Sequence, residues 1–212
     1  MKSISAILLE NLRNRRRKSE LDNSNFTIIS SNCIGGVIYH KLGLKFLSPT
    51  INLWFKPKDY LKFLNNLDYY LTSADLKEDI HINLNYPVGA LGDGAKKVTL
   101  YFQHYQTFNQ ACKKWNSRKT RVNFKNIFII MTDRDGVDEE ALREFDRLPF
   151  ENKVILTGKK YPEIKSSLYI PNCLDNNHLG DVFQKNFLTG KSKLDSFDFI
   201  GFLNGNGNRI RN

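Results

Sequence analysis

The chain has 212 residues, a net charge of +10 at pH 7, 41% hydrophobic residues and 25% charged residues. This length and composition belong to a globular protein with a substantial core, and they exclude an intrinsically disordered chain. The positive charge favours anionic partners in general, and nucleic acid, anionic lipid and phosphorylated sugar all qualify.

Residues 3–18 are predicted to form a basic amphipathic helix. Its apolar residues recur at helical spacing and arginines gather at its end, where the helix dipole favours cations; the apolar residues are Ile4, Ile7, Leu8 and Leu12. Two interpretations remain open, because such a helix either packs on the rest of the protein or lies on an anionic membrane surface. No run reaches the roughly 20 apolar residues that span a bilayer. Any membrane contact is therefore expected to be peripheral, at the inner membrane face.

The remaining sequence alternates strands and helices. The predicted strands are 26–29, 51–55, 98–102, 127–131, 153–156 and 168–170. The predicted helices are 33–42, 57–71, 107–121 and 138–148, and we expect a long, turn-rich loop over 73–97. This alternation predicts an α/β protein with a mostly parallel sheet and helices on both faces. The uninterrupted apolar run at 127–131 predicts a central strand.

The predicted organisation has three parts. Residues 1–20 form the basic helix, residues 24–200 form a single α/β domain, and residues 201–212 form a flexible tail rich in asparagine and glycine. The three cysteines show neither zinc nor CxxC spacing, which favours a reducing, cytoplasmic location; they are Cys33, Cys112 and Cys173.

The carboxyl ends of parallel strands are where such sheets bind ligands. Three polar segments are expected at this edge: 30–36, 103–105 and 132–136. Cys33 would sit near the start of a helix, where backbone N–H groups and the dipole lower a thiol pKa and suit a nucleophile. His104 could then act as its general base, with Asp133 or Asp135 orienting the imidazole. The alternative is an inert, buried cysteine.

Glycines and arginines near this edge are candidate substrate ligands. Backbone N–H groups at Gly35 and Gly36 could cradle a phosphate, although the sequence matches neither a Walker motif nor a dinucleotide fingerprint. The basic end of the 107–121 helix could neutralise phosphate or could be a solvated charge pattern. The predicted substrate-binding residues are Asn32, Gly35, Gly36, Tyr105, Arg118 and Arg121.

The segment Asp133-Arg134-Asp135 is similar to the DxD element of nucleotide-sugar glycosyltransferases. Two carboxylates at this spacing suit Mg²⁺ or Mn²⁺, and the metal would neutralise a diphosphate leaving group. Aspartate is also a common cap between a strand and a helix, and Asp135-Gly136 is ordinary turn chemistry. The sequence leaves metal binding by Asp133 and Asp135 open.

Several short motifs occur together in the order expected of one family. They are Ser31-Asn32-Cys33-Ile34-Gly35-Gly36, Leu42-Gly43-Leu44, Ser48-Pro49-Thr50, Tyr86-Pro87-Val88-Gly89, Phe102-Gln103-His104-Tyr105 and Asp133-Arg134-Asp135-Gly136. Over roughly residues 24–160 the chain resembles a bacterial domain-of-unknown-function family labelled exopolysaccharide biosynthesis protein. The resemblance implies an α/β fold and a role in surface-polysaccharide assembly, so the expected partner is an anionic sugar or a lipid-linked glycan rather than nucleic acid. A weaker likeness is to papain-like bacterial proteins.

Three functions follow as expectations. The first is a transferase of exo- or capsular polysaccharide biosynthesis that acts on a sugar or a lipid-linked glycan. The second is a hydrolase or acyltransferase that uses Cys33 and His104. The third is a non-catalytic glycan-binding or scaffolding protein.

Overall fold

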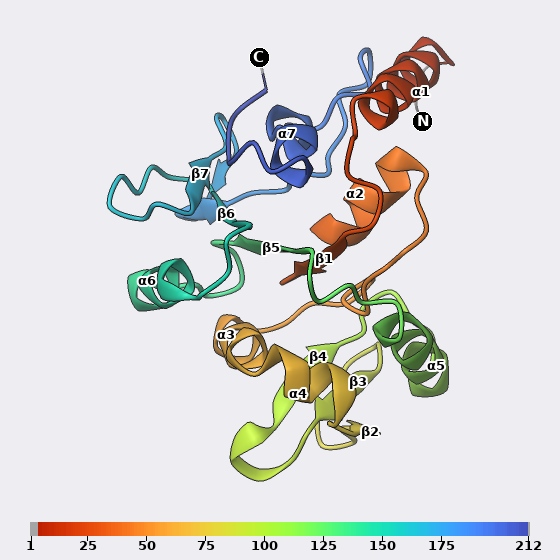
Figure 1. The fold of residues 1–212 in the computed structure, drawn as a ribbon, viewed down its shortest axis with the longest axis vertical. Helices are drawn as coiled ribbons and strands as arrows, with labels where there is room; N and C mark the ends of the chain where they lie inside the picture. Colours follow the sequence, from red (N-terminus) through yellow and green to blue (C-terminus); the bar gives the residue numbers. More distant parts are fainter. Residues whose placement is uncertain (1–3, 212) are drawn as a thin grey trace.

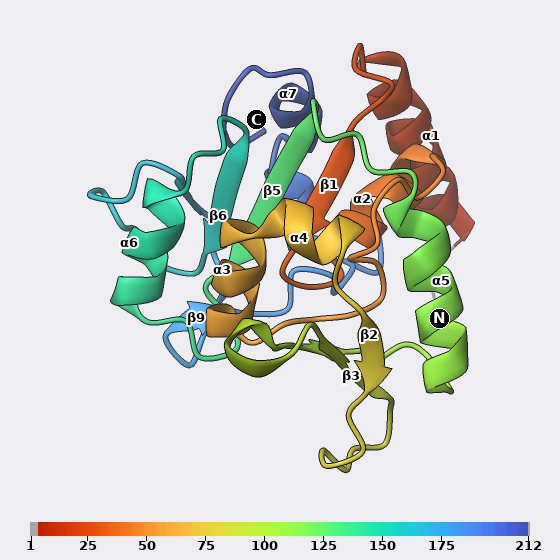
Figure 2. The same ribbon diagram turned by 60° about the horizontal axis from the view of Figure 1, so that its bottom comes forward.

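A four-stranded parallel sheet forms the centre of the protein in the computed structural model, which describes residues 4–211. The sheet order is β1–β5–β6–β7, and β1, β5 and β6 lie side by side in Figure 2. Their bounds are β1 (Thr27–Ser30), β5 (Ile127–Thr132), β6 (Lys153–Thr157) and β7 (Ser167–Tyr169). The α/β prediction is confirmed.

Helices cover both faces of this sheet (Figure 1). One face packs against α3 (Pro57–Asn65), α4 (Leu67–Thr72), α5 (Phe108–Lys119) and α6 (Glu139–Arg147). The other face packs against α2 (Ile34–Leu42) and α7 (Phe199–Leu203). Successive side chains of β5 alternate between the two cores, with Ile129 and Met131 in the first and Phe128 and Ile130 in the second. Burial on both faces explains why β5 is apolar without alternation.

The predicted loop over 73–97 contains two strands instead. These strands, β2 (Leu76–Glu78) and β3 (Val88–Leu91), pair antiparallel with β4 (Val98–Tyr101) in a separate sheet of order β2–β3–β4. A short 3-10 turn, η1 (Gly94–Lys96), joins β3 to β4. The strand β4, which precedes His104, was predicted to belong to the parallel sheet, and the structure places it in this separate sheet instead. Strands of three and four residues are too short to give a clear alternating pattern.

The segment 51–55, predicted as a strand, links the two sheets. The Phe55 N–H donates to the Ser31 carbonyl, just past the end of β1, at 3.0 Å. Trp54 and Tyr101 exchange two backbone hydrogen bonds of 3.0 Å at the end of β4. The end of β4 is thereby held beside the carboxyl edge of the parallel sheet.

The helix α1 (Ile4–Ser19) does not pack on the domain through its apolar residues, as one interpretation of its sequence expected. It buries Ala6, Glu10 and Arg17, whereas the predicted apolar stripe faces outward. The exposed fractions are 79% for Ile4, 59% for Leu8 and 61% for Leu12. Between residues 4 and 211, no helix is long and apolar enough to cross a membrane.

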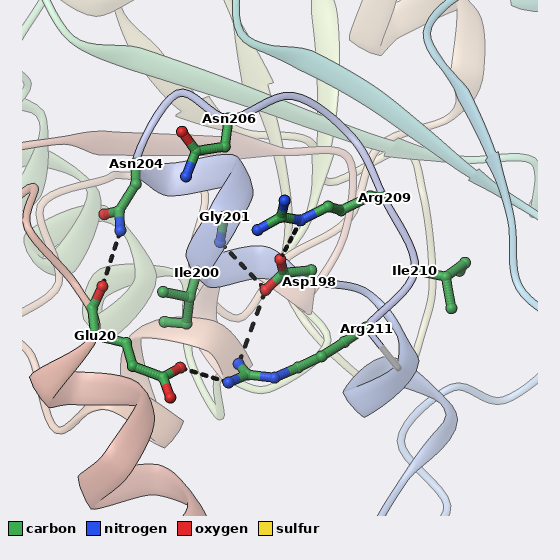
Figure 3. Close-up of a pocket in the computed structure, with 9 residues that line it drawn as sticks. All are labelled: Glu20, Asp198, Ile200, Gly201, Asn204, Asn206, Arg209, Ile210 and Arg211. Carbon is green, nitrogen blue, oxygen red and sulfur yellow. Dashed lines mark hydrogen bonds and ion pairs between the residues drawn. The ribbon is translucent and has the colours of Figure 1, made fainter.

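The C-terminal part adds β8 (Leu174–Asp175), β9 (His178–Leu179), η2 (Lys193–Ser196) and α7. The domain boundary expected at residue 200 falls inside α7, whose Leu203 is fully buried. The residues after α7 that the structure describes return to the domain. Arg209 pairs with Asp198 at 2.6 Å, and Arg211 pairs with Glu20 across a small pocket (Figure 3). These ion pairs connect α1, α7 and the end of the chain.

Candidate functional site

The turn after β1 is built by side-chain hydrogen bonds. Ser30 Oγ donates to the Asn32 carbonyl at 2.7 Å and accepts from the Gly35 N–H at 3.2 Å. Asn32 Oδ1 accepts from the Ile34 N–H at 3.2 Å and so forms an Asx turn just before α2. Its Nδ2 donates to Thr132 Oγ1 at 3.0 Å and so ties the ends of β1 and β5 together. The turn therefore presents Asn32 and Cys33 at the carboxyl edge of the sheet.

A cavity of about 670 Å³ opens at this edge, and we call it the edge cavity. Four of the predicted site residues line it: Asn32, Cys33, His104 and Asp135. His104 follows β4, which does not belong to the parallel sheet. It lies at the cavity because the backbone hydrogen bonds between Trp54 and Tyr101 hold the end of β4 beside the sheet edge. The other lining residues are Val37, Trp54, Tyr86, Gln103, Arg134, Asp181 and Phe183.

Gly35 and Gly36 serve packing and do not line the edge cavity. Both are buried. A Cβ atom on Gly35 would lie 2.7 Å from Ser30 Oγ, and one on Gly36 would lie 3.3 Å from an Ile51 methyl carbon. Small residues are required because α2 approaches β1 and residue 51 closely. The predicted phosphate cradle is thus a close helix–strand contact.

Tyr105, Arg118 and Arg121 hold the segment 46–51 and do not line the edge cavity. The Tyr105 hydroxyl donates to the Ile51 carbonyl at 3.1 Å and accepts from Arg118 Nη1 at 2.7 Å. Arg118 is only 7% exposed and its guanidinium lies 5.1 Å from the centre of the Phe46 ring. Arg121 donates to the Phe46 carbonyl at 3.2 Å. The contacts that the structure shows for these three side chains are therefore structural ones.

The two carboxylates of the DxD-like segment have different environments. Asp133 is 1% exposed, and its two oxygens accept the backbone N–H groups of Leu179 at 2.6 Å and Gly158 at 3.0 Å. Burial raises the pKa of Asp133, and these two amides oppose the rise. Both carboxylate oxygens of Asp133 therefore hold the β9 and β6 segments together, and Asp133 does not line the edge cavity.

Of the two carboxylates in this segment, Asp135 is the one that lines the edge cavity. Desolvation raises its pKa, and the positive charges of Arg134 and His178 oppose that rise. Asp133 and Asp135 thus differ in position, since only Asp135 lines the edge cavity. Within the part of the chain that the structure describes, no cluster of three or more His, Cys, Asp or Glu residues is arranged to hold a metal ion.

Cys33 does not have the lowered pKa that its place in the sequence suggested. Burial raises the pKa of its thiol to about 11, so desolvation outweighs any effect of the helix dipole. Among the described residues, no hydrogen bond joins the Cys33 sulfur to the His104 ring. The two residues share a cavity, but they do not form an ion pair or a hydrogen-bonded dyad.

We expect Cys33 to react slowly with iodoacetamide at neutral pH. Because only the thiolate attacks, the labelling rate should rise roughly tenfold per pH unit and keep rising above pH 9. Mass spectrometry of the peptide that contains Cys33 measures this rate separately from Cys112 and Cys173, and a Cys33→Ser variant gives the background. A rate that levels off near pH 7 would show an activated thiolate and contradict the prediction.

Aromatic residues of the cavity were not predicted as site residues. Trp54 is half-buried and stacks on Tyr101 with 4.0 Å between ring centroids. Tyr86 comes from the segment before β3, and Phe183 follows β9. The motif around Tyr86 was visible in the sequence, but nothing in the sequence alone indicated that it approaches Cys33.

Two comparisons with known proteins agree with one another. Residues 4–204 match the family described as "Domain of unknown function (DUF1919)". A Haemophilus influenzae protein described as "Uncharacterized protein" is 41% identical over 191 residues, which are 90% of this chain and 90% of that protein. Neither description names a reaction or mentions exopolysaccharide.

Proposed function

Since this chain belongs to the family described as a domain of unknown function (DUF1919), whose description names no reaction, we propose its function from the edge cavity. The protein is a transferase that moves a sugar or another group onto a carbohydrate of cell-surface polysaccharide biosynthesis. The polysaccharide context rests on the motif resemblance given above. The transfer would take place in the cytoplasm at the inner membrane face, where lipid-linked glycans are accessible.

The observation that carries this proposal is the composition of the edge cavity. Half-buried aromatic rings of Trp54, Tyr86 and Phe183 line it together with polar groups of Asn32 and Gln103. A sugar ring offers an apolar face for stacking and hydroxyl groups for hydrogen bonding, so it matches a cavity with both kinds of group. The volume of about 670 Å³ lies within the usual range for small-molecule sites.

Asp135 is suited to move the proton of the reaction. Its raised pKa makes it a better base than an ordinary surface aspartate. In the transfer, Asp135 takes the proton of an acceptor hydroxyl, whose oxygen bonds to the donor carbon while the bond from that carbon to the leaving group breaks. Arg134 lines the cavity beside Asp135 and neutralises a phosphate leaving group, a role that was predicted for Arg118 and Arg121.

Tryptophan fluorescence tests carbohydrate binding directly. The chain has two tryptophans, and Trp115 is 1% exposed, so a change on adding ligand reports mainly on Trp54. Nucleotide sugars and sugar phosphates, each with and without Mn²⁺, should include one that shifts this signal, and a Trp54→Phe variant should lose the shift. By calorimetry, Trp54→Ala should weaken the affinity about tenfold, whereas Phe124→Ala on an exposed ring elsewhere should not.

The same ligand then separates the candidate functions. With a carbohydrate acceptor, Asp135→Asn should lower the transfer rate on the order of a hundredfold, and the exposed Asp75→Asn should leave it unchanged. A protein that binds sugar but transfers nothing is a glycan-binding or scaffolding protein. Absence of binding to any of these ligands would refute the proposal.

A second candidate is supported by the shared cavity of Cys33 and His104. In that function His104 would take the thiol proton while the sulfur attacks an acyl carbonyl. The thioester would form as the bond from that carbonyl carbon to its leaving group breaks, and the leaving group would take the proton from His104. The raised pKa of Cys33 stands against it. Loss of activity in Cys33→Ser with Asp135→Asn still active would favour this candidate over the first.

A further inference from the structure

The outward side of α1 is apolar, which is the reverse of an ordinary surface helix. Ile4, Leu8 and Leu12 are 79%, 59% and 61% exposed. The side of α1 that faces the domain carries two charged residues instead, because Glu10 and Arg17 are buried there together with Ala6. Nothing in the described structure covers the apolar side.

A loop distant in the sequence extends this apolar surface. Gly190 packs so closely on α1 that a Cβ atom on it would lie 2.8 Å from the Ala6 carbonyl oxygen, and the loop lies beside α1 in Figure 1. The same loop exposes Phe187 by 59% and Leu188 by 69%. We call this combined surface the α1 face, and it consists of Ile4, Leu8, Leu12, Phe187 and Leu188. Exposed apolar surfaces of this kind mark interaction sites.

A positively charged cleft lies on the flank of α1. Five cationic side chains and one carboxylate line it, together with two serines; the charged residues are Arg13, Arg16, Arg17, Lys191, Arg211 and Asp195. Asp195 already pairs with Arg17 and with Lys41 outside the cleft. Arg13 Nε and Nη2 are buried without a hydrogen-bond partner in the described structure. A buried guanidinium group without an acceptor is costly, so this cleft is suited to an anion.

We propose that the protein docks on an anionic lipid surface through the α1 face and this cleft. The apolar side chains enter the boundary between headgroups and acyl chains, and the cations that line the cleft attract a headgroup phosphate. Charge complementarity selects a membrane over a second copy of this chain. Two copies meeting at the α1 face would bring together their own cations, including Arg15 and Lys18 of the same helix, and these would repel one another.

The proposal goes beyond the transferase function and does not depend on it, because docking needs no substrate. Sedimentation with phosphatidylcholine vesicles, with and without phosphatidylglycerol, measures it. We expect binding to the anionic vesicles that weakens steeply with added salt, and little binding to the neutral ones. Equal binding to both kinds of vesicle, or to neither, would overturn the proposal.

Matched variants locate the contact. Leu8→Glu and Leu12→Glu should each weaken vesicle binding on the order of tenfold, whereas Ile80→Glu, at a residue 79% exposed on the β2–β3 hairpin, should not. Arg13→Gln and Lys191→Gln should each weaken it about fivefold, and Lys113→Gln on α5 should have a smaller effect. Circular dichroism verifies that each variant is folded, and Lys191→Gln tests the cleft if Arg13→Gln fails to fold.

Two other outcomes assign the surface elsewhere. If inorganic phosphate binds by calorimetry with Arg13-dependent affinity while vesicles are not bound, the cleft is a site for soluble anions and docking is refuted. If light scattering shows a dimer that Leu8→Glu dissociates, and vesicles are not bound, the α1 face is an interface between copies. Failure of docking in either way leaves the sugar-binding test of the edge cavity unaffected.

Discussion

Replacing Asp195 by asparagine should lower the free energy of unfolding by about 3–5 kcal/mol. The Asp195 carboxylate lies 2.5 Å from Arg17 Nη1 and 3.0 Å from Lys41 Nζ, and all three side chains are at most 5% exposed. Without the negative charge, two cations remain buried without compensation. Urea unfolding measures the loss. Asp75→Asn, at an exposed position on the same protein, is the matched control and should change stability by less than about 0.5 kcal/mol.

The same network predicts how stability depends on pH. Burial alone would raise the pKa of Asp195, but the Ser192 amide, Lys41 and Arg17 outweigh it and hold the pKa well below 3.8. A carboxyl whose pKa is lower in the folded state stabilises the protein above its unfolded pKa and loses this contribution as pH falls. The wild-type free energy of unfolding should therefore decrease below about pH 4. Asp195→Asn should show a shallower decrease, and parallel curves for the two proteins would contradict this account.

The parallel sheet was predictable because each of its main strands is a short apolar run that can be recognised in the sequence without knowledge of its partners. In β5, every residue from Phe128 to Thr132 is buried, and an apolar run without alternation can satisfy two cores at once. The β2–β3 hairpin carries no such signal. Glu78 and Lys77 of β2 are exposed, so this strand is defined by its pairing with β3 and not by burial.

The location of the site was easier to predict than the contacts of its side chains. One cavity is lined by Cys33, His104 and Asp135, as their places after predicted strands indicated. The strand before His104, β4, nevertheless belongs to the antiparallel sheet and not to the parallel one. The direction in which a basic side chain points depends on contacts that the sequence does not show. Arg118 points to the Ile51 carbonyl and the Phe46 ring, both of which come from a segment more than sixty residues earlier in the chain.

The N-terminal helix shows the same limit. Its apolar spacing was read correctly, but spacing alone does not say whether an apolar side faces the protein or its surroundings. In this protein Arg17 turns the polar side of α1 toward the domain. Arg17 forms an ion pair with Asp195, and its guanidinium lies 4.8 Å from the centre of the Phe199 ring. The partner, Asp195, is 178 residues away in the sequence, so its contribution becomes visible only in the folded chain.

Replacing Asp133 by alanine should destabilise the protein by about 2–5 kcal/mol. The change leaves the Gly158 and Leu179 N–H groups buried without their acceptor oxygens. Asp133→Asn should cost less, because one amide oxygen still accepts a hydrogen bond while the NH₂ group faces the other donor. Loss of the buried charge offsets part of the cost in both variants, since burial raises the pKa of Asp133 and so disfavours its ionised form.

Asp135→Asn is the matched control, two residues along the same turn. The Asp135 side chain accepts no hydrogen bond in the described structure, and asparagine tolerates the left-handed backbone at this position (φ 64°), so the free energy of unfolding should change by less than about 0.5 kcal/mol. The pair of variants thereby assigns the two aspartates by different measurements: urea unfolding responds to Asp133, and carbohydrate transfer responds to Asp135. An Asp133→Ala protein with wild-type stability and no transfer activity would reverse that assignment, because it would mean that the Asp133 carboxylate acts on the substrate and is not required by the fold.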